Sequence, residues 1–131
     1  MEPLSRLRLP VVAAPMKLVS GPELVLAACR AGIIGAFPTP NARPIDVLER
    51  WMIQITEGLA RLRDAPDGDR LGPWCANLVT HSSNQRLAED LALVARFQPP
   101  LVVTALGSPK PAIEVVHRYG GRVIADVTTP T

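Results

Sequence analysis

Side chains that could do chemistry stand where the short apolar runs of this chain end. They are, run by run, Pro15, Met16 and Lys17; Phe37, Pro38 and Thr39; Asn77, Thr80 and His81; Ala105, Gly107 and Ser108; and Asp126, Thr128 and Thr129. Asn77 offers two donors and an acceptor carbonyl, so it could hydrogen-bond the edge of a heteroaromatic ring or satisfy a neighbouring loop. Asp126 could serve as a base, although acids at strand ends also bond loop amides. The pattern indicates a site at the ends of several strands and names no reaction.

Several catalytic and binding motifs are absent from the sequence. His81 beside Ser82 and Ser83 could form a Ser-His dyad, but no G-x-S-x-G supports a nucleophile elbow. No G-x-G-x-x-G or G-x-x-x-x-G-K occurs, which argues against a dinucleotide-binding or P-loop site. Cys29 and Cys75 are too few and too far apart for a zinc site. We therefore expect no metal site and two reduced thiols in the core.

The composition is that of an ordinary globular domain. With 131 residues, of which 47% are hydrophobic and 20% charged, residues 1–131 are expected to form one domain with its own core. The net charge of +2 and the mixing of acids with bases give no case for a nucleic acid or a membrane surface as partner. No apolar run approaches the roughly 20 residues that cross a bilayer, and the N-terminus lacks the apolar stretch of a signal peptide. We expect a cytoplasmic protein.

Apolar runs alternate with amphipathic segments along the whole chain. The expected strands are Val11–Ala14, Ile33–Phe37, Trp74–Val79, Leu101–Leu106 and Val123–Val127. The expected helices are Pro22–Ala31, a helix that begins near Pro44, Gln85–Phe97, and a helix from Pro109 to Tyr119. Strand–helix–strand units require parallel pairing, which predicts an α/β fold. Two architectures remain open: a doubly wound sheet, or the first half of a (β/α)8 barrel, which needs roughly 200 residues or more.

The first of these units has the most detailed local prediction. Val11–Ala14 is expected to form a strand that is buried on both faces. Ser20 and Glu23 match a capping box, in which the Ser20 hydroxyl accepts a hydrogen bond from the Glu23 amide. Ligands of such folds bind at the loops that follow the strands. Residues 14–19 are therefore the first place where a ligand is expected.

Five segments occur in a fixed order over nearly all of the chain. They are Ala-Ala-Pro-Met at 13–16, Ser-Gly-Pro-Glu-Leu at 20–24, Ala-Gly-Ile-Ile-Gly-Ala-Phe-Pro at 31–38, Ala-Asn-Leu at 76–78 and Tyr-Gly-Gly-Arg-Val-Ile-Ala-Asp-Val at 119–127. Together they resemble the nitronate monooxygenases, formerly called 2-nitropropane dioxygenases. The resemblance implies an FMN-dependent flavoprotein, an oxidoreductase that oxidises alkyl nitronates with dioxygen. It also implies a TIM (β/α)8 barrel, of which this chain would be the N-terminal half, truncated after strand five.

The resemblance also assigns roles to individual residues. The implied cofactor-binding residues are Ala14, Pro15, Met16, Asn77, Asp126 and Thr128. The first three would follow the flavin through backbone contacts, Asn77 would approach its ring, and Asp126 or Thr128 would line the pocket after strand five. The family's catalytic histidine follows strand six and its phosphate-binding loops follow strands seven and eight, beyond Thr131. Neither histidine of this chain is assigned that role, and the catalytic residues are left unknown.

Three expectations follow for the activity and association of the chain. The chain alone is expected to be inactive and to hold FMN weakly, because charge-assisted phosphate contacts would be missing. Its open sheet edges are expected to promote self-association. Two other functions stay open: a flavin-dependent enoyl reductase of the same fold, which would require NAD(P)H, and a non-catalytic half-barrel that works by self-association or by pairing with a complementary half.

Overall fold

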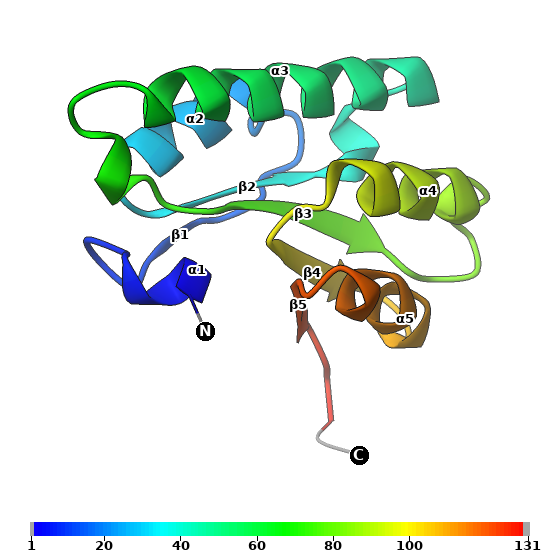
Figure 1. The fold of residues 1–131 in the computed structure, drawn as a ribbon. Coiled ribbons are helices and arrows are strands. Elements are labelled where there is room, and N and C mark those ends of the chain that lie inside the picture. The colour runs from blue at the N-terminus through cyan, green and yellow to red at the C-terminus, as the bar shows by residue number, and fades with distance from the viewer. Residues whose placement is uncertain (1, 130–131) are drawn as a thin grey trace.

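A five-stranded parallel sheet runs through the centre of the molecule, which a computed structural model describes for residues 2–129 (Figure 1). The strands are β1 (Val12–Ala13), β2 (Ile34–Pro38), β3 (Trp74–Val79), β4 (Leu101–Ala105) and β5 (Arg122–Ala125). They lie side by side in chain order, and every neighbouring pair is parallel. The order does not reverse, as it would at the switch point of a doubly wound sheet. The predicted α/β class and the sequential strand order are confirmed.

The crossover helices all pack on one side of this sheet. The helices are α1 (Glu2–Ser5), α2 (Pro22–Arg30), α3 (Ile45–Arg63), α4 (Leu87–Phe97) and α5 (Lys110–Arg118), with 3₁₀ turns at Thr39–Asn41 and Gly68–Arg70. Helices α2 to α5 cover one face, and the short α1 lies on the other side, below β1 in Figure 1. No helix among residues 2–129 is long and apolar enough to cross a membrane.

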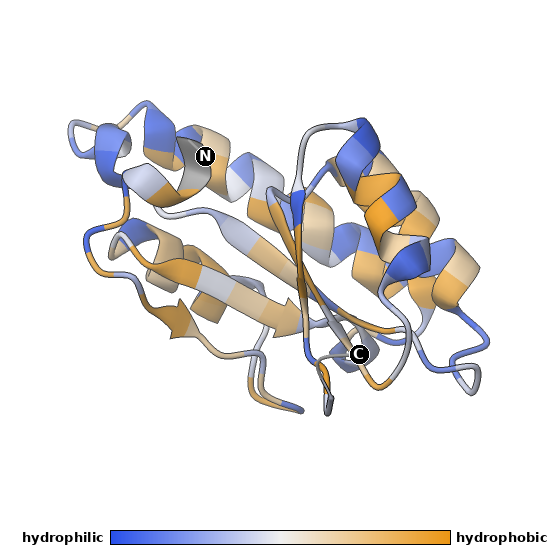
Figure 2. Cartoon of the chain, turned by 90° about the horizontal axis from the view of Figure 1, so that it is seen from below, coloured by the Kyte–Doolittle hydropathy of each residue, from blue (hydrophilic) through white to orange (hydrophobic). Residues whose placement is uncertain are grey.

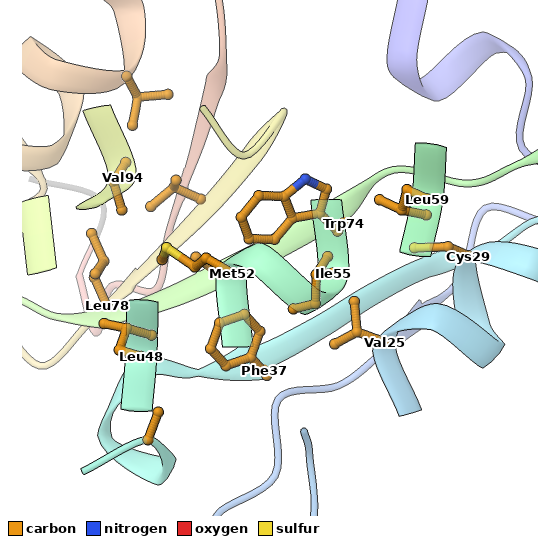
Figure 3. Packing of buried hydrophobic residues seen from close by; sticks show 14 of the residues in the cluster. Val25, Cys29, Phe37, Leu48, Met52, Ile55, Leu59, Trp74, Leu78 and Val94 are labelled. Carbon is orange, nitrogen blue, oxygen red and sulfur yellow. The ribbon is translucent and has the colours of Figure 1, made fainter. Parts of the chain in front are cut away.

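The main core lies between the sheet and helices α2 to α5 (Figure 3). Phe37 of β2 stacks on Trp74 of β3 with ring centroids 6.5 Å apart, and it meets Trp51 of α3 edge-on at 5.8 Å. Met52 and Ile55 of α3 pack into the same cluster and are fully buried. Each side chain of this size contributes roughly 1.5–3 kcal/mol when it is fully buried. The core therefore fixes the sheet from its helical side.

The opposite face of the sheet carries a smaller apolar cluster. Figure 2 shows the molecule from below, with hydrophobic residues of the strands in orange. Its buried members are Ile34, Ala36, Cys75 and Leu101, and the partly buried Leu4, Leu7 and Val103 pack against them. Towards the sheet edges this face is open: Val12 of β1 is 40% exposed and Ile124 of β5 is 47% exposed. The prediction that Val11–Ala14 is buried on both faces is therefore wrong. As the edge strand, β1 pairs only with β2 among the described strands.

Local predictions at the helix ends have mixed outcomes. The capping box at Ser20 and Glu23 is wrong, because α2 begins after Gly21 without any side-chain cap. The Ser20 hydroxyl instead turns back into the preceding loop, where it bonds the Met16 amide. Gly32, just past the end of α2, has a φ of 80°, a left-handed conformation that glycine adopts without strain. The fourth strand ends one residue early because Leu106 takes a φ of 63°, outside the extended region.

Both cysteines are free core thiols, as expected. Cys29 and Cys75 are buried, and no disulfide joins them. Burial raises the pKa of Cys29 to about 11 and that of Cys75 to about 12. Thiols with such high pKa values form little thiolate near neutral pH, so neither is a nucleophile.

Candidate functional site

A cavity of about 500 Å³ opens where β1, β2 and β3 end. Its lining residues are Pro15, Lys17, Leu18, Pro38, Pro40, Asn41, Arg43 and Asn77. Parallel strands all end at the same edge of the sheet, and the register places Pro38 of β2 directly beside Asn77 of β3. The fold thus brings Pro15, from the loop after β1, to the same cavity as Asn77.

The loop after β1 is a tight turn that hydrogen-bonds to itself. The Met16 amide donates to Ser20 Oγ at 2.8 Å, and the Ser20 hydroxyl donates to the Ala14 carbonyl at 3.4 Å. The amides of Val19 and Ser20 both donate to the Met16 carbonyl, at 3.2 and 3.0 Å. Ser20 is fully enclosed by this turn and is 1% exposed. The hydroxyl expected to cap α2 therefore shapes the loop that lines the cavity.

Asn41 joins this loop to the turn after β2. Its Oδ1 accepts from the Leu18 amide at 3.0 Å, and its Nδ2 donates to the carbonyls of Met16 and Ser20, both at 2.9 Å. One side chain thus satisfies three backbone groups of a loop that precedes it by more than twenty residues. Leu18 has a φ of 65°, which is unfavourable for a residue with a branched side chain. The Asn41 bond to its amide holds it there.

Asn77 points a half-buried carboxamide into the site. Its Nδ2 donates to the Val103 carbonyl of β4 at 3.3 Å. Asn77 therefore bonds a neighbouring segment of the protein, close to the second of the two roles considered for it. Within residues 2–129 no hydrogen bond to Asn77 Oδ1 is formed, although the atom belongs to a cavity-lining residue. The acceptor of Asn77 is available to a donor on a ligand.

The cavity is positively charged. Lys17 and Arg43 are its charged lining residues, and no Asp or Glu lines it in the described part of the chain. Arg43 Nε donates to the Pro40 carbonyl at 3.1 Å, which keeps this side chain against the turn after β2. Three proline rings and Leu18 form the apolar part of the cavity wall. Such a combination suits a mostly apolar ligand that carries negative charge.

A buried ion pair at the start of α4 supports the turn after β2. Asp90 of α4 is 1% exposed, and its Oδ1 lies 2.8 Å from Arg86 Nε. Arg86 also donates to the carbonyls of Ala42 at 2.6 Å and Thr39 at 2.8 Å, while the Thr39 hydroxyl donates to Asp90 Oδ2 at 3.2 Å. Burial raises the pKa of Asp90, and the Arg86 charge opposes that rise. Arg86 and Asp90 line a second, larger cavity of about 800 Å³ between this turn and α4.

Not all predicted site residues line the first cavity. Met16 lies in the loop that borders it, and its side chain is 42% exposed. Asp126 and Thr128 follow β5 at the other edge of the sheet, where both are exposed, and neither lines this cavity. The Asp126 amide donates to the Thr104 carbonyl at 2.9 Å, which continues the β4–β5 pairing.

The possible Ser-His dyad is a local turn. His81 Nδ1 lies 2.8 Å from Ser83 Oγ, and the Ser83 amide donates to the same nitrogen at 3.2 Å. Both residues are exposed and outside the first cavity. A nitrogen that already accepts from an amide cannot take up the hydroxyl proton while that bond persists, so the pair is not arranged as a nucleophile and its base.

The residues that sequence reasoning missed are Asn41, Arg43 and Ser20. Asn41 belongs to the 3₁₀ turn Thr39–Asn41, of which only Thr39 was singled out from the sequence. The available signal was an asparagine in the turn that follows β2, whereas Asn77 lies inside β3, near its carboxyl end.

The comparisons with known proteins add no further assignment. Neither a search of protein-family models nor one of curated proteins finds a match for this chain. Its function is therefore argued from the geometry of the site.

Proposed function

We propose that this chain is the flavin-binding N-terminal portion of an FMN-dependent oxidoreductase of the nitronate monooxygenase type, which oxidises alkyl nitronates with dioxygen. The observation that carries the proposal is the shared cavity of Pro15 and Asn77 at the carboxyl ends of the strands. These are two of the residues that the resemblance assigns to the flavin, and they come from different strands.

The sheet supports a barrel for the whole protein. Strands follow one another without reversal, and helices α2 to α5 lie on one face. In a (β/α)8 barrel, each helix lies outside and the other face of the sheet becomes the interior. The small cluster around Ile34, Cys75 and Leu101 occupies the face that would become this interior. An open apolar edge on both β1 and β5 is what further barrel strands would cover.

The cavity residues fit an isoalloxazine ring. Pro15, Pro38 and Leu18 would contact its apolar surface, and Asn77 Oδ1 would accept from a ring N–H. Lys17 and Arg43 would favour negative charge on the ring or on a bound nitronate. When bound, FMN would supply the redox chemistry with dioxygen; the residues of this chain would orient the ring and attract the anionic substrate.

The flavin site can be tested on the chain as it is. A ¹⁵N-labelled sample is titrated with riboflavin and, separately, with FMN, and amide shifts are followed by NMR. We expect weak binding of both ligands, with shifts at Lys17, Leu18 and the Asn77 carboxamide. FMN should bind only modestly tighter than riboflavin, because the exposed Lys17 and Arg43 are the only described cavity residues that could attract its phosphate. Asn77→Ala should lower the affinity about three- to tenfold, the value of one hydrogen bond of roughly 0.5–1.5 kcal/mol.

Asn84→Ala is the matched control for this titration. Asn84 makes two hydrogen bonds to backbone, with the Val79 carbonyl at 2.8 Å and the Arg86 amide at 3.1 Å, and it lies outside the first cavity. It should leave riboflavin binding unchanged. Shifts spread over the whole molecule, or none at saturating riboflavin, would contradict the flavin site.

The reaction itself is tested in a chimera. Residues 1–129 are joined to strands six to eight of a nitronate monooxygenase, and the product is assayed for retained flavin and for oxygen consumption with propyl-2-nitronate. Activity that depends on Asn77 supports the proposal. A yellow chimera that oxidises NAD(P)H and reduces an enoyl substrate, but does not oxidise the nitronate, would favour the enoyl reductase instead.

A second candidate function rests on the exposed edges of the sheet. Val11 and Val12 at β1 are 46% and 40% exposed, and Ile124 and Val127 at β5 are 47% and 59% exposed. Apolar edge strands pair readily with other chains, which favours a non-catalytic half-barrel that self-associates. Sedimentation equilibrium of the wild type and of Ile124→Lys tests it: a dimer that dissociates in the variant supports this function, and a wild-type monomer refutes it.

A further inference from the structure

We propose that Asn41 is a positioning residue that holds the loop 14–20 in the shape that binds the flavin. The inference rests on the proposed function and extends it to a residue that lies outside the five segments of the resemblance. It concerns how the cavity is kept open, and not which atoms react.

Asn41 holds the turn at both of its ends. Its Nδ2 donates to the carbonyls of Met16 and Ser20, the first and last residues of the turn, at 2.9 Å each. Its Oδ1 accepts from the amide of Leu18, at the middle of the turn, at 3.0 Å. Alanine could form none of these bonds, and aspartate could form only the last. The carboxamide is thus the group that this arrangement requires.

The cavity-lining residues of the loop lie between these contacts. Lys17 is flanked by Met16 and Leu18, whose carbonyl and amide are both bound to Asn41. Leu18 lines the cavity in a left-handed conformation, with a φ of 65°, and its side chain is 88% exposed. Without Asn41 nothing described holds the Leu18 amide, and this residue would relax toward the conformations that branched residues prefer.

Asn41 itself is held in place by the buried ion pair. Arg86 donates to the carbonyls of Thr39 and Ala42, which lie on either side of Asn41 in the chain. Asp90 fixes the guanidinium, with Oδ1 lying 2.8 Å from Nε. A continuous set of contacts therefore leads from α4, through the turn after β2, to the loop after β1. A loop already held in its binding shape loses less entropy when the ligand binds.

The test measures loop order and ligand affinity in the same samples. Hydrogen exchange of the Leu18 and Met16 amides and the riboflavin titration are recorded for the wild type, Asn41→Ala and Asn41→Asp. We expect exchange at Leu18 to be at least about tenfold faster in Asn41→Ala, because its amide loses its partner. We expect riboflavin affinity to fall about three- to tenfold, as the ligand must then order the loop. Asn41→Asp should bind at least as poorly, because its carboxylate would face two carbonyl oxygens.

Tyr119→Phe is the control for a loss of stability alone. The Tyr119 hydroxyl donates to the Pro99 carbonyl at 2.9 Å, far along the sheet from the cavity, so the variant should lower the melting temperature without changing riboflavin affinity. If Asn41→Ala does not fold, Ser20→Ala is used in its place. It removes the hydrogen bonds of the Ser20 hydroxyl within the same turn and should show the same loss of riboflavin affinity. The proposal is overturned if Leu18 exchange and riboflavin affinity are unchanged in the folded variant, or if Asn41→Asp binds like the wild type.

The two proposals fail in different ways. If the wild type shows no riboflavin shifts, flavin is refuted as the ligand, and with it the role of Asn41 in flavin binding. If the wild type binds riboflavin at this loop but the Asn41 variants bind equally well, the flavin site stands and only the positioning role is overturned.

Discussion

Arg86 offers the sharpest test of how the site is supported. Replacing it by Met keeps most of the aliphatic side chain but removes the guanidinium. The Asp90 carboxylate, which is 1% exposed, then loses its ionic partner, and the carbonyls of Thr39 and Ala42 lose their donor. The substitution removes one member of a buried ion pair and leaves the other charge buried without a partner, which is strongly destabilising.

The expected loss of stability for Arg86→Met is about 3 kcal/mol. Removing one member of a buried ion pair costs roughly 3–5 kcal/mol. The lower end applies because the Arg86 side chain is 20% exposed, so that water can reach some of the groups it leaves. With an m-value of about 2 kcal/mol per M, the urea midpoint should fall by about 1.5 M. The added variant Asp90→Asn should recover part of this loss, because no buried charge then remains unpaired.

The loss should depend on pH, and its sign follows from Asp90. In the folded protein, burial already raises the pKa of Asp90 above the ordinary value of an aspartate, and Arg86 opposes the rise. Between the unfolded and folded pKa values the folded state binds more protons, so stability decreases as pH rises through that window. Without Arg86 the folded pKa rises further and the window extends upward. The Arg86→Met variant should therefore be least stable near neutral pH. It should regain stability at lower pH, where Asp90 takes up a proton.

The assay is urea unfolding followed by tryptophan fluorescence at about pH 7 and about pH 5. Trp74 is 4% exposed in the core and reports the global transition. A loss below about 0.5 kcal/mol, the range of ordinary surface substitutions, would refute the reasoning. So would a loss that is the same at both pH values, or one that Asp90→Asn makes larger.

Two further substitutions test the packing around the sheet. Thr104→Val should raise the free energy of unfolding by about 1 kcal/mol, because Thr104 Oγ1 is buried without a hydrogen-bond partner among residues 2–129. If thermal unfolding instead shows that the variant is less stable, the hydroxyl has a bound partner such as water. Gly35→Ala should lower stability by more than about 2 kcal/mol, since a Cβ there would lie 2.4 Å from the Val25 carbonyl oxygen of α2. Gly58→Ala is its matched control: the new Cβ would meet only the movable end of Leu26, at 2.7 Å, so its loss should be smaller. Equal losses in the two glycine variants would contradict this account of how α2 approaches β2.

The sheet was predictable because its signals are local. The three central strands are mostly apolar, with Asn77 in β3 and Thr104 in β4 as their polar residues, and such runs mark strands that are covered on both faces. The predicted and observed limits of β3 agree, and those of β2 differ by one residue at each end. The parallel arrangement followed from the helix between each pair of strands.

Other features depended on which strand became an edge. Val11–Ala14 is as apolar as the central strands, yet β1 has two residues and is partly exposed. Composition reports how apolar a run is, whereas exposure depends on whether another strand or helix lies beside it. The same reason explains β5, where the expected run Val123–Val127 gives a strand at Arg122–Ala125 with mostly exposed residues.

The candidate site divides in the same way. The alternation of strands with helices and the place of Asn77 near a strand end could be predicted from the sequence, because both are properties of a few neighbouring residues. Two other features depend on the folded arrangement: Ser20 bonds its own loop and does not cap α2, and Asn41 bonds Met16 and Leu18 in the loop after β1. A polar side chain has several partners of similar energy within reach along the chain. Which one it bonds is settled when the sheet brings segments more than twenty residues apart into contact.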